Sequence, residues 1–150
     1  MLNPSHCQIC LRPIKLVRGL IAHHGYQRPG QGWQTASCLG AKHQHVEVSN
    51  ARMGAVALLL ITWAAQHEAA AANLIASPPE TMRRSASWNR RAEDVARPEG
   101  FNPRAPQTFG LYGGLFMDVV SRAKCAARDQ RAFAAELEAR AAAWKPAAVV

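Results

Sequence analysis

Four potential metal ligands near the N-terminus constrain the fold of this chain of 150 residues more than any other feature. Cys7 and Cys10 form a Cys-x2-Cys pair, His24 follows after thirteen residues, and Cys38 follows after another thirteen. Three thiolates and one imidazole complete a tetrahedral zinc site without an open position, which is the arrangement of a structural ion. We therefore expect one structural zinc ion that fixes the fold of the N-terminal region.

The spacing alone does not decide which histidine binds the ion. His23 and His24 are adjacent, and neighbouring side chains of an extended segment point to opposite faces, so only one of them is expected to reach the metal. The other is then available for a hydrogen bond or for the surface. His43 and His45 are alternative fourth ligands, because Cys38-x4-His43 is also a workable spacing.

The cysteines are expected to be reduced thiols. Residues 1–6 contain no basic segment followed by an apolar run, so they do not resemble a signal peptide, and we expect a cytoplasmic protein. A redox-active Cys7–Cys10 pair is disfavoured, because Leu11-Arg12-Pro13 does not open a helix well. Cys125 lies alone within a helical stripe and is expected to be an ordinary core residue.

Hydrophobic periodicity and proline content divide the chain and predict an α+β fold. The zinc-binding module contains two short strands within Ile14–Ala22, bent at Gly19, and then a hairpin over Gly25–Cys38. A helical pair follows, joined by an irregular crossover rich in proline and arginine. The predicted segments are the module at 1–48 and the helical domain at 49–150, with helices at 49–77 and 111–145 and the crossover at 78–110.

Each predicted helix carries an apolar stripe near the helical period of 3.6 residues. We expect the helices to pack as an antiparallel pair in which Trp63, Phe133 and Trp144 supply most of the apolar burial. Alternatively, the stripes are docking faces for another protein or for a second copy in a homodimer. The stripes are Met53, Val56, Leu60, Trp63, Ala70 and Leu74 in the first helix, and Leu115, Val119, Ala126, Phe133, Leu137, Ala141 and Trp144 in the second.

Only the segment from Met53 to Ile75 raises the question of a membrane span. Gln66, His67 and Glu68 interrupt its apolar run, whereas a spanning helix needs about 20 predominantly apolar residues. An acidic residue near the middle of a span is also costly. We therefore expect a buried helix of a soluble protein and no membrane partner.

The N-terminal module contains a distinctive segment from Leu20 to Ala41, which reads Leu-Ile-Ala-His-His-Gly-Tyr-Gln-Arg-Pro-Gly-Gln-Gly-Trp-Gln-Thr-Ala-Ser-Cys-Leu-Gly-Ala. With Cys7-x2-Cys10 upstream and Val46–Ser49 downstream, it resembles a group of uncharacterised zinc-binding proteins of bacteriophages, prophages and other proteobacterial mobile elements. The resemblance covers residues 6–49 and the ending Ala143–Pro146. The histidine directly before Gly-Tyr recurs in that group, which implies His24 as the ligand. The resemblance also implies a bacterial host cell, but no established activity.

The charge of the chain suggests a polyanionic partner. Eighteen Lys and Arg against ten Asp and Glu give a net charge of +8, and residues 1–50 carry five bases against one acid, Glu47. A basic zinc module with aromatic residues among its arginines is typical of binding to a nucleic-acid backbone. Alternatively, these are solvated surface charges. The expected binding residues are Lys15, Arg18, Tyr26, Arg28 and Trp33 in the module, and Arg83, Arg84, Arg90 and Arg91 around Trp88, a patch suited to stacking on single-stranded bases.

Catalysis is not expected. The first 50 residues contain no aspartate and a single glutamate, whereas magnesium-type catalytic sites require carboxylates. The chain also lacks a Gly-rich phosphate loop and a nucleophile elbow. Two non-enzymatic functions are therefore expected. The first is binding to DNA or RNA, and the alternative is docking on a host defence complex, such as a CRISPR effector, as an inhibitor.

Overall fold

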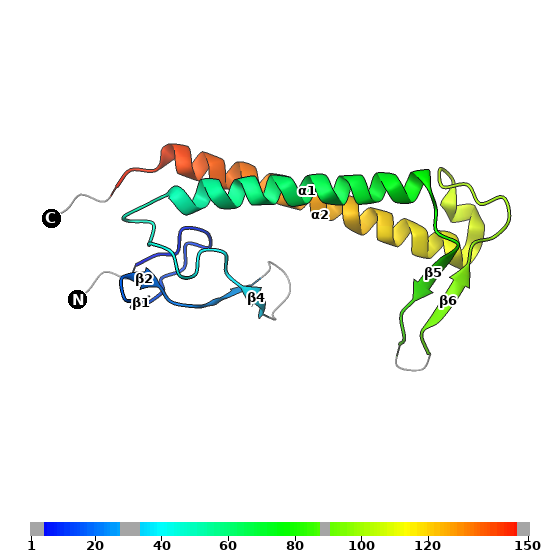
Figure 1. Ribbon diagram of the computed structural model, residues 1–150, viewed down its shortest axis with the longest axis horizontal. Coiled ribbons are helices and arrows are strands. Elements are labelled where there is room, and N and C mark those ends of the chain that lie inside the picture. The colour runs from blue at the N-terminus through cyan, green and yellow to red at the C-terminus, as the bar shows by residue number, and fades with distance from the viewer. Residues whose placement is uncertain (1–4, 28–33, 88–90, 147–150) are drawn as a thin grey trace. The chain divides into compact units, whose positions relative to one another are not determined.

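The predicted α+β class is confirmed by a computed structural model that describes residues 5–27, 34–87 and 91–146 (Figure 1). Within these residues, three two-stranded antiparallel sheets, β1–β2, β3–β4 and β5–β6, accompany two long helices. The elements in chain order are β1 (Leu16–Val17), β2 (Leu20–Ile21), β3 (Gly25–Gln27), β4 (Gln34–Ser37), α1 (Ala51–Ala76), β5 (Thr81–Arg84), β6 (Glu93–Ala96), the 3-10 helix η1 (Pro106–Phe109) and α2 (Gly110–Ala143).

The chain forms two compact units, and each long helix contributes to both. The first unit contains Met1–Leu60 and Ala132–Val150, so it holds the N-terminal sheets, the start of α1 and the end of α2. The second unit is Ile61–Arg131, which holds the rest of both helices with β5, β6 and η1. Each unit has its own buried side chains.

The β1–β2 hairpin of the first unit forms where the sequence predicts two short strands. Leu16 pairs with Ile21 and Val17 with Leu20. Both residues of the turn between them have left-handed backbones, Arg18 with φ 54° and Gly19 with φ 79°. Two consecutive left-handed residues match the twist of a tight hairpin, and glycine adopts this conformation at no steric cost. The predicted bend at Gly19 is therefore confirmed.

Hydrogen bonds in the first unit tie the ends of both helices to the N-terminal loops. The Asn50 amide, just before α1, donates to the carbonyl oxygen of Ala141 near the end of α2 at 3.0 Å. The Trp144 indole donates to Val46 O at 2.6 Å. Arg140 of α2 donates to Ile9 O at 3.2 Å, within the Cys7–Cys10 turn. The start of α1 and the end of α2 therefore meet at the same end of an antiparallel helix pair.

The second unit is built around an aromatic cluster. The Phe101 ring makes edge contacts with Phe109, Tyr112 and Phe116, at centroid distances of 5.2, 4.8 and 5.1 Å. The Tyr112 hydroxyl donates to the carbonyl oxygen of Pro79, just after α1. These aromatic contacts fix the start of α2 against the chain that leaves α1. The buried residues of this core are Ala71, Met82, Tyr112, Phe116 and Val120.

The crossover between the helices is more regular than the sequence predicts. Instead of an irregular segment, β5 and β6 form a hairpin with four cross-strand pairs, from Thr81↔Ala96 to Arg84↔Glu93. Met82 lies opposite Val95, and both pack in the aromatic core. Two consecutive arginines of β5 pair with two consecutive acids of β6, so the strands show no alternation of apolar and polar residues in the sequence.

The buried stripes of the helices differ from the predicted stripes by one position over much of their length. Met53, Val56, Leu60 and Leu137 are buried as predicted. Trp63 is 36% exposed and does not supply the predicted burial. Apart from Ala57 beside Val56, successive buried positions lie three, four or seven residues apart, and the seven-residue steps match the heptad spacing of a coiled-coil seam. Where the predicted stripes fail, the buried residues are Ala64 and Ala71 in α1, and Phe116, Val120, Ala127 and Ala134 in α2.

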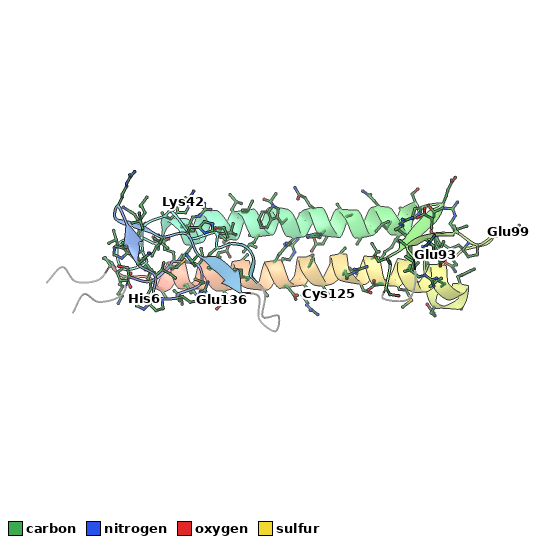
Figure 2. The ribbon with its side chains drawn as sticks, turned by 90° about the horizontal axis from the view of Figure 1, so that it is seen from below. His6, Lys42, Glu93, Glu99, Cys125 and Glu136 are labelled. Atoms are coloured by element: carbon green, nitrogen blue, oxygen red, sulfur yellow. The ribbon has the colours of Figure 1, made fainter. Side chains whose placement is uncertain are left out.

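Cys125 contradicts its predicted role as a core residue. It is exposed on α2, as the side-chain view in Figure 2 shows. The seam passes through Ala127, two positions further along the helix, and two positions correspond to about half a turn. A free thiol on the surface of α2 follows from this register.

Among the described residues, α1 is the one helix long and apolar enough to cross a membrane by length and composition. Core helices of soluble proteins meet the same criteria. Glu68 lies near its middle and forms an ion pair with Arg131 of α2 at 2.7 Å. Met53, Val56 and Leu60 are buried within the first unit, but most positions of α1 are exposed, so the helix is less buried than the sequence predicts. In this structure α1 is therefore one half of a helix pair.

Candidate metal centre

The structure brings the four predicted ligands together. One ligand atom from each of Cys7, Cys10, His24 and Cys38 lies within 4.8 Å of the other three. The Cys7 and Cys38 sulfurs are 3.8 Å apart, and the Cys10 sulfur is 3.3 Å from Nε2 of His24. A tetrahedral ion with bonds of about 2.3 Å to sulfur and about 2.0 Å to nitrogen separates its ligand atoms by roughly 3.5 to 3.8 Å. These residues are therefore positioned to bind one metal ion, and the donor set fits zinc.

Tight backbone turns present the sulfurs. The amides of Ile9 and Cys10 donate to the Cys7 sulfur, and the amide of Gly40 donates to the Cys38 sulfur. A side chain at Gly40 would place its Cβ only 2.3 Å from the sulfur of Cys7. Glycine is required there because the second turn passes directly beside a ligand of the first. The amide bonds stabilise the thiolate forms that a metal needs.

The ring orientation of His24 is fixed by the backbone. Its Nδ1 donates to the carbonyl oxygen of Ala22 at 2.9 Å, so Nε2 is the nitrogen available to a metal. His23 is exposed and lies outside the cluster. His43 and His45, the alternative fourth ligands, are also outside it, and Nδ1 of His45 bonds Glu47 instead. The geometry therefore favours His24 among the candidates that the sequence leaves open.

Replacing His24 with alanine is expected to weaken metal binding severely, while His23→Ala leaves it unchanged. Loss of His24 removes one of four ligands, whereas the exposed His23 ring contributes none. Competition with a chromophoric chelator measures the affinity of each variant. A His23→Ala protein that loses its metal while His24→Ala retains it would reverse the ligand assignment.

The Cys7 and Cys38 sulfurs share a hydrogen bond that shifts their pKa values in opposite directions. The hydrogen bond with Cys38 lowers the pKa of Cys7 below its ordinary value. The same bond and burial raise the pKa of Cys38. A dipositive ion would lower the pKa of both cysteines, because it stabilises both thiolates at once. The paired sulfurs are therefore arranged for a metal rather than for two independent thiols.

Arg12 supplies positive charge beside the ligands. Its guanidinium donates to the carbonyl oxygen of Gly25, immediately after His24. A hydrogen bond to the Cys10 sulfur raises the pKa of Arg12. Three thiolates and one imidazole leave a net charge of about −1 on a zinc complex, and Arg12 compensates it. The sequence reasoning did not single out this residue, because its position beside Cys10 depends on the turn.

Glu47 closes the N-terminal loop around the site. Its carboxylate accepts hydrogen bonds from the His6 amide at 3.1 Å, from the His6 ring, and from the His45 ring at 2.9 Å. Burial acts to raise the pKa of Glu47, but the bonds from His6 and His45 outweigh it and lower that pKa to about 2. Cys7 lies between these contacts, since it follows His6 and forms a bridge with His45. Glu47 thus holds the segment that presents the first ligand.

Glu47→Gln is expected to destabilise the first unit by about 1.5 kcal/mol at neutral pH, through loss of charge-assisted hydrogen bonds. A carboxylate with a lowered pKa contributes stability above its unfolded-state pKa of about 4.5 and loses it as the pH falls through about 2. The difference between wild type and variant should therefore be complete above pH 5 and shrink below it. Denaturant unfolding of both proteins from about pH 3 to pH 7 measures it, and a difference independent of pH would contradict the role of the carboxylate.

The predicted basic residues of the N-terminal module are only partly described. Lys15 and Arg18 are exposed on the β1–β2 hairpin. Arg28 and Trp33 lie outside the described residues, as does the side chain of Tyr26 in β3. The structure adds two cations of the same unit that the sequence reasoning did not single out, Lys42 and Arg52. They come from different segments and converge only in the fold.

The second predicted patch is partly neutralised. Arg83 pairs with Asp94 at 3.0 Å, and Arg84 pairs with Glu93 across the same hairpin. Arg91 is exposed, and Arg90 lies outside the described residues. Two of the four arginines therefore have acidic partners of their own.

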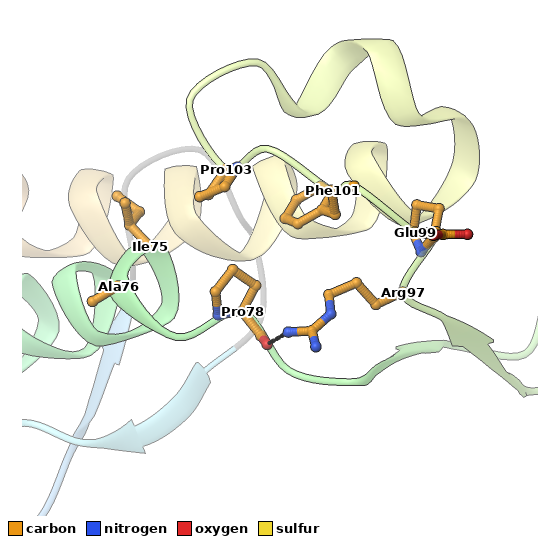
Figure 3. A pocket seen from close by; sticks show the side chains of 9 residues that line it. Ile75, Ala76, Pro78, Arg97, Glu99, Phe101 and Pro103 are labelled. Carbon is orange, nitrogen blue, oxygen red and sulfur yellow. Dashed lines mark hydrogen bonds between the residues drawn. The ribbon is translucent and has the colours of Figure 1, made fainter.

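A shallow cavity of about 500 Å³ lies in the second unit, between the end of α1 and the chain after β6 (Figure 3). Ile75, Pro78 and Phe101 form its apolar walls. Its one lining arginine, Arg97, donates to the carbonyl oxygen of Pro78, and Glu99 lies at the same cavity. The described residues that line this cavity include no cluster of like charges and no cluster of metal ligands.

No protein-family model, curated protein or solved structure matches the chain.

Proposed function

We propose that this protein is a non-enzymatic binding protein whose metal-stapled first unit contacts nucleic acid or a nucleic-acid-associated complex. The single observation that carries the proposal is the distribution of unpaired charge. In residues 1–60, Glu47 is the only acid, and its carboxylate is occupied by His6 and His45. In the described part of the chain, no ion pair involves Lys15, Arg18, Lys42 or Arg52.

The second unit contrasts with the first. Five of its arginines form ion pairs with acids on the same hairpin, on the same helix or across the helix pair, whereas Arg91, Arg97 and Arg104 form none among the described residues. The first unit holds one arginine–carboxylate pair, Arg140 with Glu136. An arginine that is paired with a nearby acid attracts a polyanion only weakly, whereas unpaired cations on one unit attract phosphate groups more strongly. The pairs of the second unit are Arg83–Asp94, Arg84–Glu93, Arg122–Asp118, Arg128–Asp129 and Arg131–Glu68.

The proposal assigns no catalytic step to the metal centre. When bound, the ion supplies folding energy and a fixed arrangement of the turns that carry the cations. Three thiolates and one imidazole leave a four-coordinate ion no position for water or substrate. The resemblance of residues 6–49 to proteins of phages and mobile elements motivates a role in the biology of such elements.

Binding to mixed-sequence DNA and RNA is expected to weaken steeply with salt. Four phosphate contacts predict a loss of about a hundredfold in affinity between about 50 mM and about 200 mM salt on duplex DNA, since each neutralised phosphate releases counterions. Fluorescence anisotropy with labelled oligonucleotides measures the slope. Absence of binding at the lower salt concentration would overturn the nucleic-acid proposal.

A second candidate function is docking on a protein, as an inhibitor of a host defence complex. The observation that favours it is a group of large apolar side chains exposed near the first metal-binding turn and on the β1–β2 hairpin. Exposed apolar clusters of this kind are typical of protein-interaction sites. They are Leu11, Leu16, Val17 and Leu20, which are 38–53% exposed.

Docking through these side chains should persist in high salt, because apolar burial is not screened. Val17→Ser, at the most exposed of the four positions, is expected to abolish capture of a host complex and to leave oligonucleotide binding intact. A complex that is captured equally well by the variant, and released by salt, would contradict the docking function.

A further inference from the structure

A second cavity lies within the first unit, between the segment Lys42–Gln44 and the first turns of α1. Its volume is about 390 Å³, which is large enough for a phosphate group with part of its organic substituent. Three lining residues bear basic groups, Lys42, His43 and Arg52, and the polar side chains of Gln8, Gln44 and Ser49 complete the lining. None of the described residues that line the cavity is acidic. Leu20 forms part of its apolar wall.

The backbone holds Lys42 at this cavity in an uncommon conformation. Its φ of 63° lies in the left-handed region, which residues other than glycine rarely adopt. Two hydrogen bonds fix it there, from the Lys42 amide to Ile21 O at 2.8 Å and from the Ile21 amide to His43 O at 2.9 Å. The side chain of Lys42 is exposed, and Figure 2 labels it in the first unit. A cation is thus presented to the cavity at some cost in backbone energy.

Arg52 is also placed against local electrostatics. It lies in the first turn of α1, where the helix dipole is positive and a cation is unfavourable. No acidic residue occupies that turn. The Nε of Arg52 donates to the carbonyl oxygen of Leu39 at 2.8 Å, which fixes the guanidinium at the cavity. Burial and the charge of Arg52 lower the pKa of His43, a sign that these groups act on one another.

The amides of the first helical turn do not provide the site. The Ala51 amide donates to the Ser49 hydroxyl at 3.2 Å, and the Arg52 amide donates to Oε1 of Gln8 at 2.9 Å. These donors already have partners within the protein. Recognition at this cavity therefore depends on the side chains of Lys42, His43 and Arg52.

We propose that the cavity lined by Lys42, His43 and Arg52 binds a phosphate group. An anion there relieves the repulsion among groups that have no acidic neighbour in the cavity, and it accepts hydrogen bonds from all three. Where the phosphate belongs to a nucleic-acid backbone, this site rests on the proposed function, and it is the point at which the backbone is anchored to the protein. A free phosphate or a mononucleotide presents the same chemistry.

Inorganic phosphate is the probe that tests the site directly. In ¹H–¹⁵N spectra of the zinc-loaded full chain at constant ionic strength, it should cause saturable shifts confined to the amides of Lys42–Gln44 and Arg52. Lys42→Gly keeps the left-handed backbone and removes the cation, so the dissociation constant for phosphate should rise about tenfold. Lys124→Ala is the control, because Lys124 is an exposed lysine of α2 in the second unit that does not line the cavity. It should leave phosphate binding unchanged.

Shifts that do not saturate, or that spread over the whole basic surface, would overturn the site, as would equal effects of Lys42→Gly and Lys124→Ala. A labelled oligonucleotide separates this result from the proposed function. Displacement of the oligonucleotide by phosphate supports a nucleic-acid anchor. Local phosphate binding without any oligonucleotide binding supports a site for a free phosphate compound and refutes the proposed function alone. Oligonucleotide binding without local phosphate shifts refutes the phosphate site alone.

Discussion

Cys38→Ala is expected to release the metal ion and to unfold the first unit. Cys38 is buried, its sulfur lies 3.8 Å from that of Cys7, and its turn carries Gly40 against the same ligand. Binding of a structural zinc ion is worth about 10 to 16 kcal/mol in small zinc domains. The whole stability of a typical domain is about 5 to 15 kcal/mol. If the loss of one ligand releases the ion, the first unit loses a free energy of binding that is as large as the whole free energy of unfolding of a typical domain.

Cys125→Ala is the matched control for this variant. It removes a thiol that is exposed on α2 in the second unit, so metal content and folding should not change. Metal analysis of the purified proteins, together with ¹H–¹⁵N spectra, measures both outcomes. The amides of the first unit should collapse to disordered positions in Cys38→Ala, while the second unit keeps its aromatic core. A Cys38→Ala protein with a full complement of metal would contradict the role of Cys38 as a ligand of a structural metal ion.

Gly113→Ala is expected to destabilise the second unit by about 3 kcal/mol, through overpacking that the backbone must relieve. A Cβ on Gly113 would lie 1.7 Å from the carbonyl oxygen of Pro106. That oxygen belongs to η1, directly before α2. Tyr112, which precedes Gly113 in the chain, is buried in the aromatic core. Relief of the clash must move either η1 or the first turn of α2, and both carry aromatic residues of that core.

Gly114→Ala separates steric clash from helix propensity. A Cβ at this exposed position would have no neighbour within 4 Å, and the substitution removes a flexible residue from a helix interior. It should stabilise the protein by about 0.5 to 1 kcal/mol. Denaturant unfolding followed by near-ultraviolet circular dichroism of the aromatic core measures both variants. Equal stabilities for Gly113→Ala and Gly114→Ala would contradict the close approach of η1 to α2.

The metal ligands could be predicted from the sequence because soft ligands are rare and their clustering is visible without a fold. The choice of His24 could not be made from spacing, since His23 has the same residue type one position away. It depends on the Nδ1 bond to the carbonyl oxygen of Ala22, which exists only in the folded turn. Glu47 was missed as a structural residue for a similar reason, because its partners His6 and His45 meet it only in the fold.

The helices could be predicted from their period, but not their register. A search for large apolar residues selects Trp63, whereas the seam uses Ala64 and Ala71, which permit close approach of the helices. The β5–β6 hairpin escaped prediction because its strands contain few apolar residues, and arginine–carboxylate pairs fill the remaining positions. Long-range convergence also brings Lys42 and Arg52 to one cavity, which no local pattern reveals.

X-ray absorption spectroscopy at the zinc edge tests the central claim most directly. The purified protein should contain one zinc ion per chain, with three sulfur ligands at about 2.3 Å and one nitrogen ligand at about 2.0 Å. A fitted shell with an oxygen ligand, with two sulfurs, or with five ligands would contradict the closed site formed by Cys7, Cys10, His24 and Cys38.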